Sequence, residues 1–478
     1  MPPKAESSRS EMKKTEKNTW AVLPYNIERI KNHYLVSNLF GSWDMLDRKE
    51  FVQLESNDLG EQMGLFKRLR NSGIIADEKT LKGLIEQYRR LHSHLFNDTS
   101  LHIAVVTTRC NMNCLYCQTK NNTPQDMTIE VASRVLKYVF DTQNPYANIE
   151  FQGGEPLLNW DIIKFITENA QRINTGNKHL AISLVTNGTL LDDKKISYLA
   201  KHNVGICFSF DGPASVHNHN RVIGSGKDAY HIVKDAVART KKIYKEHGLP
   251  HSVNLLCTIT RQSLQEPEKI IDEYLSLGSD RIALRPLSRL GLAKDQWDAI
   301  GYTAEEFLAF WTQAMDHLLK LNKKGRKIQE RLCAVVLSKI FKKENPGYVD
   351  MMSPCGAGRA VLAYMPNGDI YPCDEARMVG ESMFRIGNIL KDDYQTVMKS
   401  NNVFCLCEAS LMDLWDYNTA FLPWLGTCPV LNYAQNNSLV PKIKASGLHK
   451  IFTFQIRYIF DRILEDARNK EVFLSWLT

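Results

Sequence analysis

Six apolar runs of five to nine residues recur between residues 99 and 300, and stretches with helical periodicity separate them. The stretches 127–143, 161–173 and 229–247 carry apolar residues at helical spacing. This alternation predicts parallel strands joined by right-handed helical crossovers, hence an α/β fold built as a partial (β/α)6 barrel. Such a barrel places its chemistry at the carboxyl ends of the strands. The six runs are residues 101–108, 148–152, 180–186, 204–210, 252–260 and 281–286.

The chain before the barrel divides into two parts. Residues 1–19 are polar and of mixed charge, so we expect a disordered tail. Residues 20–98 predict a winged-helix-like domain, with two strands within 34–46 that meet at Gly41 and three helices after them. Gly73 is the expected C-terminal cap of the middle helix. The helices are expected over residues 50–55, 60–73 and 77–96.

The chain after the barrel divides into three parts. Residues 301–349 predict two helices that act as a helical linker, and residues 350–447 predict an irregular domain that holds most of the remaining cysteines. Residues 448–478 predict an amphipathic helix, which we expect to dock on the protein's own body rather than on a membrane. Its apolar face comprises Ile451, Phe452, Ile456, Ile459, Phe460 and Ile463.

Composition narrows the class of protein. Apolar content of 44% and charged content of 24% are typical of a globular protein, and no apolar run reaches the roughly 18 residues that a membrane span needs. The net charge of +7 is scattered along the chain, so a nucleic-acid partner is not favoured. The N-terminus lacks the apolar stretch of a secretory signal, so we expect a cytoplasmic protein. Eleven cysteines in a reducing compartment indicate metal or redox chemistry rather than disulfides.

Three of these cysteines follow the first predicted strand directly. Cys110, Cys114 and Cys117 are spaced C-x3-C-x2-C, at the barrel end where chemistry is expected. Three thiolates can hold three irons of a 4Fe–4S cluster and leave the fourth iron open to a small chelating molecule. Zinc is the competing interpretation, although catalytic zinc sites more often mix histidine with cysteine. Three unconnected core cysteines are the remaining alternative.

This spacing resembles the signature of the radical S-adenosylmethionine superfamily, and further motifs follow the next three strands. They are GGEP at 153–156, TNG at 186–188 and SFDGP at 209–213. The resemblance implies that the fourth iron is chelated by S-adenosylmethionine. The cluster would then reduce the sulfonium and release a 5′-deoxyadenosyl radical that abstracts hydrogen from a substrate carbon. The residues that it places around the cofactor are Tyr116, Gly153, Gly154, Glu155, Pro156, Asn187, Ser209 and Arg221.

Individual roles follow from the same resemblance. Gly153 and Gly154 are expected to let the backbone approach S-adenosylmethionine, and Glu155 to accept hydrogen bonds from its amine. Pro156 is expected to stiffen the turn after them. Ser209 and Arg221 resemble residues that meet the carboxylate or the ribose, with a barrel hydroxyl and a surface salt bridge as the plainer alternatives. Asn187 is a weaker candidate for the same site.

The C-terminal region resembles a SPASM domain, which carries auxiliary 4Fe–4S clusters in peptide-modifying members of the superfamily. Cys355 and Cys373 flank an expected hairpin turned at Asn367–Gly368, and Cys428 lies in the later GTCPV run. Only Cys405 and Cys407 accompany them, so at most one auxiliary cluster with four cysteines can form unless a histidine or an aspartate replaces a cysteine. No auxiliary cluster and two auxiliary clusters are the alternatives. The acid beside the second cysteine is a base on the substrate in related sulfatase maturases; here that position is Asp374, with Glu375 as its substitute.

Within the superfamily the chain most resembles the radical maturases of His-Xaa-Ser repeat peptide systems, in runs such as IEFQGGEPLLNW, ALRPLSRLGLA and GYVDMMSP. The resemblance implies a ribosomally made peptide substrate, a leader-binding role for residues 20–98, and a reductant such as flavodoxin or ferredoxin. A sulfatase-type formylglycine-generating maturase is the alternative enzyme. A cluster-binding partner or sensor without turnover is the alternative outside enzymes.

Overall fold

The computed structural model describes residues 13–15, 18–60, 63–119, 123–176, 178–224, 226, 228–412, 418–440 and 446–477. Most of the expected N-terminal tail lies outside this set. The prediction of a tail is wrong for its described part, because β1 (Lys13–Thr15) and β2 (Asn18–Val22) pair with each other and β2 continues onto β6 (Ile75–Asp77). None of the helices described is long and apolar enough to cross a membrane.

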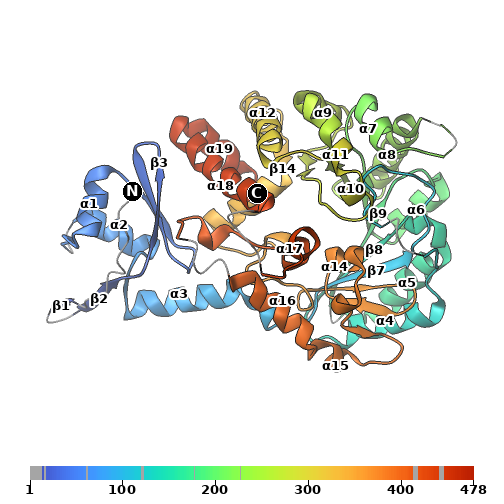
Figure 1. The fold of residues 1–478 in the computed structure, drawn as a ribbon, viewed down its shortest axis with the longest axis horizontal. Helices are drawn as coiled ribbons and strands as arrows, with labels where there is room; N and C mark the ends of the chain where they lie inside the picture. The colour runs from blue at the N-terminus through green and yellow to red at the C-terminus, as the bar shows by residue number, and fades with distance from the viewer. Residues whose placement is uncertain are drawn as a thin grey trace.

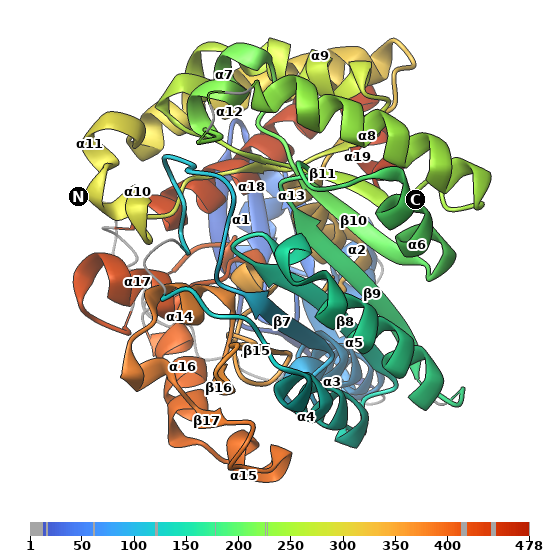
Figure 2. The ribbon, with the colours of Figure 1, turned by 90° about the vertical axis from the view of Figure 1, so that its right-hand side faces the viewer.

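A nine-stranded sheet forms the centre of the molecule (Figure 2). Its order is β13-β11-β10-β9-β8-β7-β15-β16-β17, and the first six strands are parallel to their neighbours. The predicted six-strand β/α arrangement is therefore confirmed, as an open sheet rather than a closed barrel in the part described. The six parallel strands are β7 (Leu101–Thr107), β8 (Tyr146–Gly153), β9 (His179–Thr186), β10 (Val204–Ser209), β11 (Val253–Thr258) and β13 (Leu284–Arg285).

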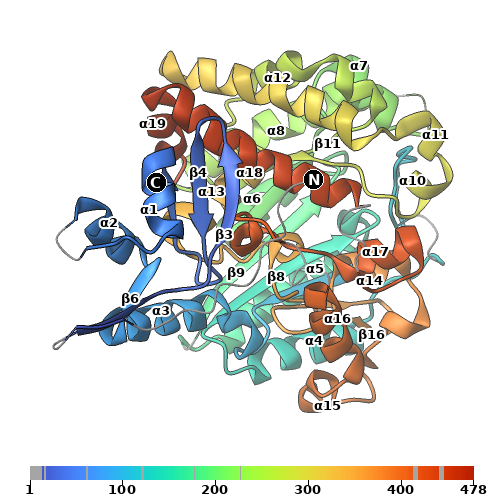
Figure 3. The ribbon, with the colours of Figure 1, turned by 60° about the vertical axis from the view of Figure 1, so that its left-hand side comes forward.

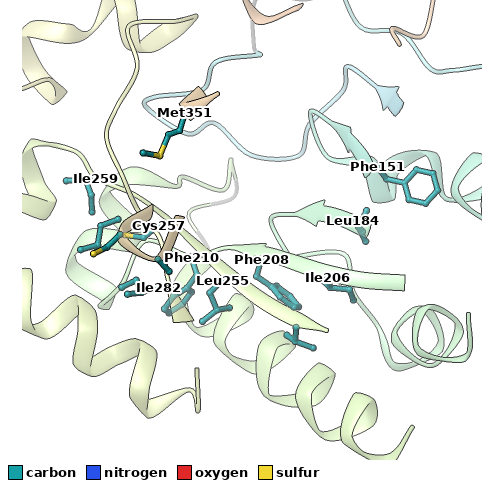
Figure 4. Close-up of a cluster of buried hydrophobic side chains, with 14 of the residues drawn as sticks. Phe151, Leu184, Ile206, Phe208, Phe210, Leu255, Cys257, Ile259, Ile282 and Met351 are labelled. Atoms are coloured by element: carbon teal, nitrogen blue, oxygen red, sulfur yellow. The ribbon is translucent and has the colours of Figure 1, made fainter. Parts of the chain in front are cut away.

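Helices cover the outer face of this sheet, and the inner face stays open to polar groups. Along β8 the fully buried residues Ala147, Ile149 and Phe151 alternate with the half-buried Glu150 and Gln152. The burial of β10 and β11 alternates in the same way, so one face packs on helices while the other is more accessible. Figure 4 shows buried apolar side chains contributed by successive strands. The crossover helices are α4 (Ile129–Asp141), α5 (Trp160–Ile173), α6 (Asp193–Lys201), α8 (Ala229–Glu246) and α9 (Pro267–Ser276).

The segment expected to be a linker belongs to the main core instead. The long helix α12 (Ala304–Lys323) contacts α9 and α18, and its Trp311 is fully buried. A capping box at Thr303 starts this helix. The next helix, α13 (Arg331–Leu337), begins after Glu330 and continues into a single π-helical turn, Ser338–Lys342.

The C-terminal region extends the same sheet rather than forming a separate irregular domain. The strand β15 (Val361–Tyr364) pairs in parallel with β7, and the hairpin from β15 to β16 (Asp369–Tyr371) is confirmed. Gly368 at its turn has φ +87°, a conformation that favours glycine. Helices complete this region: α14 (Asp374–Val379), α15 (Tyr394–Met398), α16 (Asn401–Met412) and α17 (Pro429–Asn436).

The N-terminal unit has its own apolar core beside the sheet (Figures 1 and 3). The two strands expected around Gly41 are confirmed, and Gly73 caps the middle helix with φ +87°. The long α3 leaves this unit and runs toward α16 (Figure 1). The elements are β3 (Asn26–Ile30), β4 (His33–Ser37), β5 (Trp43–Leu46), α1 (Arg48–Glu55), α2 (Gly64–Ser72) and α3 (Glu78–Leu91).

The C-terminal amphipathic helix is two helices, which corrects the prediction of one. The first, α18 (Gly447–Glu465), buries Ile456 and Ile459 completely against the main core, so docking on the body is confirmed. The chain breaks at Asp466, whose carboxylate accepts a hydrogen bond from the backbone of Arg468 and so caps the second helix, α19 (Ala467–Ser475). In the sequence, Asp466 resembles an exposed position of one continuous amphipathic helix, so the break between α18 and α19 was not predicted.

Stability should fall between about pH 4.5 and pH 7 because of Glu330. Burial raises the pKa of this carboxyl from 4.5 to about 7, although it accepts backbone hydrogen bonds from Cys333 and Leu284. Within that window the folded chain binds a proton that the unfolded chain releases, so rising pH costs up to about 3 kcal/mol. Urea unfolding of the metal-free Glu330→Gln chain should show a flatter pH slope, and the exposed Glu246→Gln control should not. Identical slopes for wild type and Glu330→Gln would contradict this assignment.

Candidate active site

The loop that carries the first three cysteines is anchored at both ends. Arg109, just before Cys110, forms a two-point ion pair with Asp126 at 2.7 and 2.9 Å. Further along, the backbone N–H groups of Asn113 and Leu115 donate to the carbonyls of residues 222 and 220. The segment after α7 (Ala214–Asn220) therefore holds the loop at the carboxyl ends of the strands.

The three thiols of this loop lie close enough to influence one another's ionisation. Burial raises the pKa of Cys114 to about 12, and the nearby Cys117 and Cys110 add to the rise while Arg221 opposes it. Burial and the neighbouring Glu155 and Cys117 also raise the pKa of Cys110. Thiols that repel each other when ionised need a bound cation to hold them as thiolates, and cationic iron supplies this. The donor set therefore fits a cluster bound through three cysteines.

The same geometry gives no support to zinc. Ligands of one zinc ion lie about 2.3 Å from it and so within roughly 4 Å of each other. Among the described residues, no group of three or more histidine, cysteine or acidic side chains is arranged to hold one metal ion. The cysteines of an iron–sulfur cluster each bind a different iron and stand farther apart.

The two glycines of GGEP let the chain pass directly over the cysteine loop. A Cβ on Gly153 would collide with the backbone oxygen of Thr107, and a Cβ on Gly154 with that of Arg109. Both backbones are also hydrogen-bonded across this contact, since Gly154 N–H donates to the Thr107 carbonyl at 3.0 Å. The backbone of these two glycines was predicted to approach the cofactor. In the structure it approaches the loop that carries Cys110, Cys114 and Cys117, which we call the cluster loop.

The carboxylate of Glu155 makes hydrogen bonds within the protein that the sequence did not predict. It is fully buried, and its carboxylate accepts hydrogen bonds from Leu157 N–H, Thr186 Oγ1 and Asn187 N–H at 2.8 to 3.1 Å. Burial raises its pKa to about 7. Pro156 starts the short 3-10 helix that Glu155 caps. One oxygen of the carboxylate has a single donor, so it keeps room for an amine.

Asn187 and Ser209 occupy the next two strand ends. Asn187 Nδ2 donates to Asn111 Oδ1 at 2.9 Å and lies 4.0 Å from Cys110 Sγ, which places it beside the loop rather than apart from it. Ser209 is half-buried at the end of β10, on the open face of the sheet. Neither position contradicts a role near the cofactor, and both roles stay predictions.

Arg221 lies in a buried network that sequence reasoning missed. Its guanidinium makes two hydrogen bonds to Asp211, at 3.0 and 3.1 Å, and lies over the ring of Tyr116, whose hydroxyl donates to the same carboxylate at 2.7 Å. Burial alone would lower the pKa of Arg221, but the Asp211 carboxylate holds it well above its usual value. Asp211 is the central residue of SFDGP, and this motif was the only sequence signal for it.

The two candidate bases face the open side of the sheet, and both are ion-paired. Asp374 Oδ1 lies 2.6 Å from the guanidinium of Arg377, which also donates to Gln152 of β8 at 2.5 Å. Glu375 lies 3.2 Å from Arg285 on the last parallel strand. The helix α14 therefore closes the site from the side of the C-terminal region, and the arginines were not predicted.

A second group of thiols lies behind α14. Cys355 and Cys373 are buried, and Cys428 packs in the same apolar cluster. Burial, Glu375 and the two other thiols raise the pKa of Cys373 well above its ordinary value. Cys405 is exposed and Cys407 half-buried on α16. The described contacts thus gather three of the five late cysteines.

Replacing Gly154 by Ala should reduce iron binding. The new Cβ would push the backbone of Arg109, and with it Cys110, away from the rest of the loop. Overpacking of this kind costs about 1 to 3 kcal/mol. Iron analysis after anaerobic reconstitution checks the expectation. Gly83→Ala is the matched control, since that helical glycine has open space around it, and it should bind iron as wild type does. Equal iron in both variants would be the contrary result.

Comparison with known proteins agrees with this geometry. Residues 104–274 match the model of the Radical SAM superfamily. The cysteine-type anaerobic sulfatase-maturating enzyme of Clostridium perfringens is 25% identical over 315 residues, which cover 63% of this chain and 80% of that protein. A solved structure of anSMEcpe with AdoMet and a peptide superposes with a TM-score of 0.66 at 21% identity and covers 78% of this chain and 99% of that one.

A second solved structure covers more of this chain. Streptococcus suis SuiB bound to the precursor peptide SuiA superposes with a TM-score of 0.54 at 15% identity, over 87% of this chain and 96% of that one. At these identities the structural likenesses concern the fold. The cofactors follow from the superfamily: a 4Fe–4S cluster and S-adenosylmethionine. The chain is an enzyme, and its residues 104–274 form a domain of the radical SAM type.

Proposed function

We propose that this enzyme is a maturase that modifies a ribosomally made peptide or small protein. The observation that carries the proposal is α14, whose Glu375 pairs with Arg285 at the end of β13 and whose Arg377 joins Asp374 to Gln152 at the end of β8. When bound, the cluster and S-adenosylmethionine supply a 5′-deoxyadenosyl radical that removes hydrogen from the substrate. The relatives support a peptide substrate, since SuiB was solved with a precursor peptide and anSMEcpe with a peptide.

The residues of this chain divide the remaining work. The backbone at GGEP and the carboxylate of Glu155 would hold the amine of S-adenosylmethionine, and Ser209 would meet its polar end. Asp374 and Glu375 would accept a proton from the substrate, and each is held in place by an arginine partner. The half-buried polar residues Glu150 and Gln152 would line the space in which the peptide lies.

The finer substrate class rests on sequence resemblance to the His-Xaa-Ser repeat maturases. The second candidate is formylglycine formation in a sulfatase, and the relative in Clostridium perfringens favours it together with the acid that follows Cys373. We also propose that Cys355, Cys373 and Cys428 hold an auxiliary cluster and that a flavodoxin or ferredoxin is the reductant. A leader-binding role for residues 20–98 completes the proposal.

One experiment tests the proposal. The reconstituted enzyme, S-adenosylmethionine and dithionite are combined anaerobically with a His-Xaa-Ser repeat peptide, or with a sulfatase peptide. We expect 5′-deoxyadenosine in proportion to a mass change in the repeat peptide. Asp374→Asn should keep uncoupled cleavage of S-adenosylmethionine while losing peptide product, and Asp161→Asn, an exposed control, should keep both. Formation of an aldehyde in the sulfatase peptide alone would favour the second candidate.

Absence of S-adenosylmethionine cleavage under every condition would overturn the enzymatic proposal. In that case the chain would bind its cluster as a partner or sensor. The same assay with photoreduced flavodoxin in place of dithionite tests the reductant. No turnover with the protein reductant, beside turnover with dithionite, would count against flavodoxin.

A further inference from the structure

A small pocket lies far from the cluster, where the N-terminal unit meets the C-terminal region. It has a volume of about 160 Å³, enough for one side chain, since a cavity of roughly 150 Å³ takes a molecule of the size of benzene. We call it the junction pocket. Its walls come from the β4–β5 turn, the end of α3, the π-helical turn and four later segments, 344–345, 353–354, 411 and 422–424. Tyr88, His92, Lys339, Glu344 and Trp424 are among its lining residues.

The pocket contains a buried cation without a counter-ion. Lys339 is 8% exposed, and its ammonium donates to the backbone carbonyls of Met351 and Trp424. No carboxylate of the described residues pairs with it, and burial lowers its pKa to about 8. Glu344 lines the same pocket but forms no ion pair with the lysine in the part described. A buried ammonium costs free energy unless an anion offsets it, and one of its three donors stays unused.

A second donor in the pocket wall also lacks an acceptor. Trp424 is 1% exposed, and its indole N–H has no hydrogen-bond partner among the described residues. His92 and His94 lie close by, and burial together with the Lys339 charge lowers the pKa of both. The wall therefore holds a buried ammonium without an ion pair and an indole N–H without a hydrogen-bond partner among the described residues, and Glu344 is its one acidic side chain. A carboxylate with an apolar neighbour is the group that such a pocket fits.

An exposed apolar stripe leads along α3 to the pocket. Leu81, Ile85 and Tyr88 are 37%, 42% and 41% exposed, and their spacing places them on one face of the helix. Tyr88 belongs both to this stripe and to the pocket wall. From Leu81 to Tyr88 the stripe is about 10 Å long, which three residues of extended peptide cover. Arg90, one turn further, is exposed and has no ion pair in the part described.

We propose that the junction pocket receives an acidic side chain of the peptide substrate, while apolar residues preceding it lie on the α3 stripe. The inference rests on the proposed function and gives residues 20–98 a defined contact with the substrate. Its occupant is an acidic-apolar segment outside the modified site, because no lining residue of the pocket belongs to the cluster loop, to α14 or to the ends of β8 and β13. Lys339 supplies selectivity for the charge, and the stripe supplies apolar contact.

Two matched peptides test the proposal on the full-length holoenzyme. The probes are a fluorescein-labelled Leu-Thr-Leu-Asp amide and the same peptide ending in Asn, measured by fluorescence anisotropy. We expect the Asp peptide to bind about 10-fold more tightly or better, and Lys339→Met to abolish that preference. Lys320→Met, on the exposed face of α12, should keep it. Iron content and uncoupled S-adenosylmethionine cleavage of Lys339→Met should equal those of wild type.

Two results would overturn the inference. One is equal binding of the Asp and Asn peptides to wild type, and the other is an undiminished preference of Lys339→Met for the Asp peptide. A dimer in sedimentation that Ile85→Asp disrupts would show that a second copy of the chain covers the stripe. If Lys339→Met fails to fold, trace acetylation of wild-type Lys339 replaces it: the Asp peptide should protect this lysine, and lack of protection refutes the proposal. The enzyme could form peptide product in the maturation assay and yet bind the Asp and Asn peptides equally. That result would refute the junction pocket as a substrate site and leave the proposed function standing.

Discussion

Joint replacement of Cys110, Cys114 and Cys117 by Ala is expected to remove about four irons per chain and to abolish cleavage of S-adenosylmethionine. These thiols lie within eight residues of one another, and the thiol neighbours contribute to the raised pKa of Cys110 and Cys114. Iron and sulfide analysis after anaerobic reconstitution measures the loss, and 5′-deoxyadenosine measures the activity.

A control must show that the loss of iron does not follow from replacing any buried cysteine. Cys333 is buried on α13 beside Glu330 and serves as the control. Alanine at this position should leave the iron content unchanged. A loop variant that retained all its iron would refute the cluster assignment, whatever its activity.

Iron and sulfide measurements also test whether an auxiliary cluster is bound. Replacing Cys355, Cys373 and Cys428 by Ala should remove a separate set of irons and spare uncoupled S-adenosylmethionine cleavage. Iron equal to that of wild type would show that these thiols are only packed in the apolar cluster around them. The loop variant and this one should together lose the sum of the two sets, because the sites do not share ligands.

Sequence predicted the fold well where the signal was local. Strands such as 204–209 and helices such as α4 carry complete apolar patterns, and the three loop cysteines lie within eight residues of each other. The hairpin at Asn367–Gly368 also follows from a short turn signal. Each of these features is determined by neighbours along the chain.

Sequence did not predict the contacts that join distant segments. The parallel pairing of β15 with β7 joins segments about 260 residues apart, and no pattern in either strand specifies its partner. Arg377 and Arg285 hold the two candidate acids, yet they resemble ordinary surface arginines in sequence. Glu155 was predicted to accept hydrogen bonds from a ligand amine. In the structure its carboxylate already accepts three, from Leu157, Thr186 and Asn187.

Replacing Asp211 by Asn is expected to lower the free energy of unfolding by about 3 to 5 kcal/mol. Asp211 is fully buried, and it neutralises Arg221, which is 7% exposed. The neutral amide leaves that guanidinium buried and uncompensated, and it also weakens the hydrogen bond from Tyr116. Chemical denaturation of the metal-free chain measures the change. The exposed Asp161→Asn, whose partner Lys164 is one turn away, should cost almost nothing.

The pair should also control the cluster loop, because residues 220 and 222 next to Arg221 hold the loop backbone. Asp211→Asn is therefore expected to bind less iron than wild type at equal protein concentration. A double variant, Asp211→Leu with Arg221→Met, removes both charges and should be more stable than either single variant. If the single variants each cost little and their effects simply add, the charges are solvated and the network does not hold the loop. A large coupling energy together with lost iron would instead make this buried ion pair the element that fixes three thiols on one cluster.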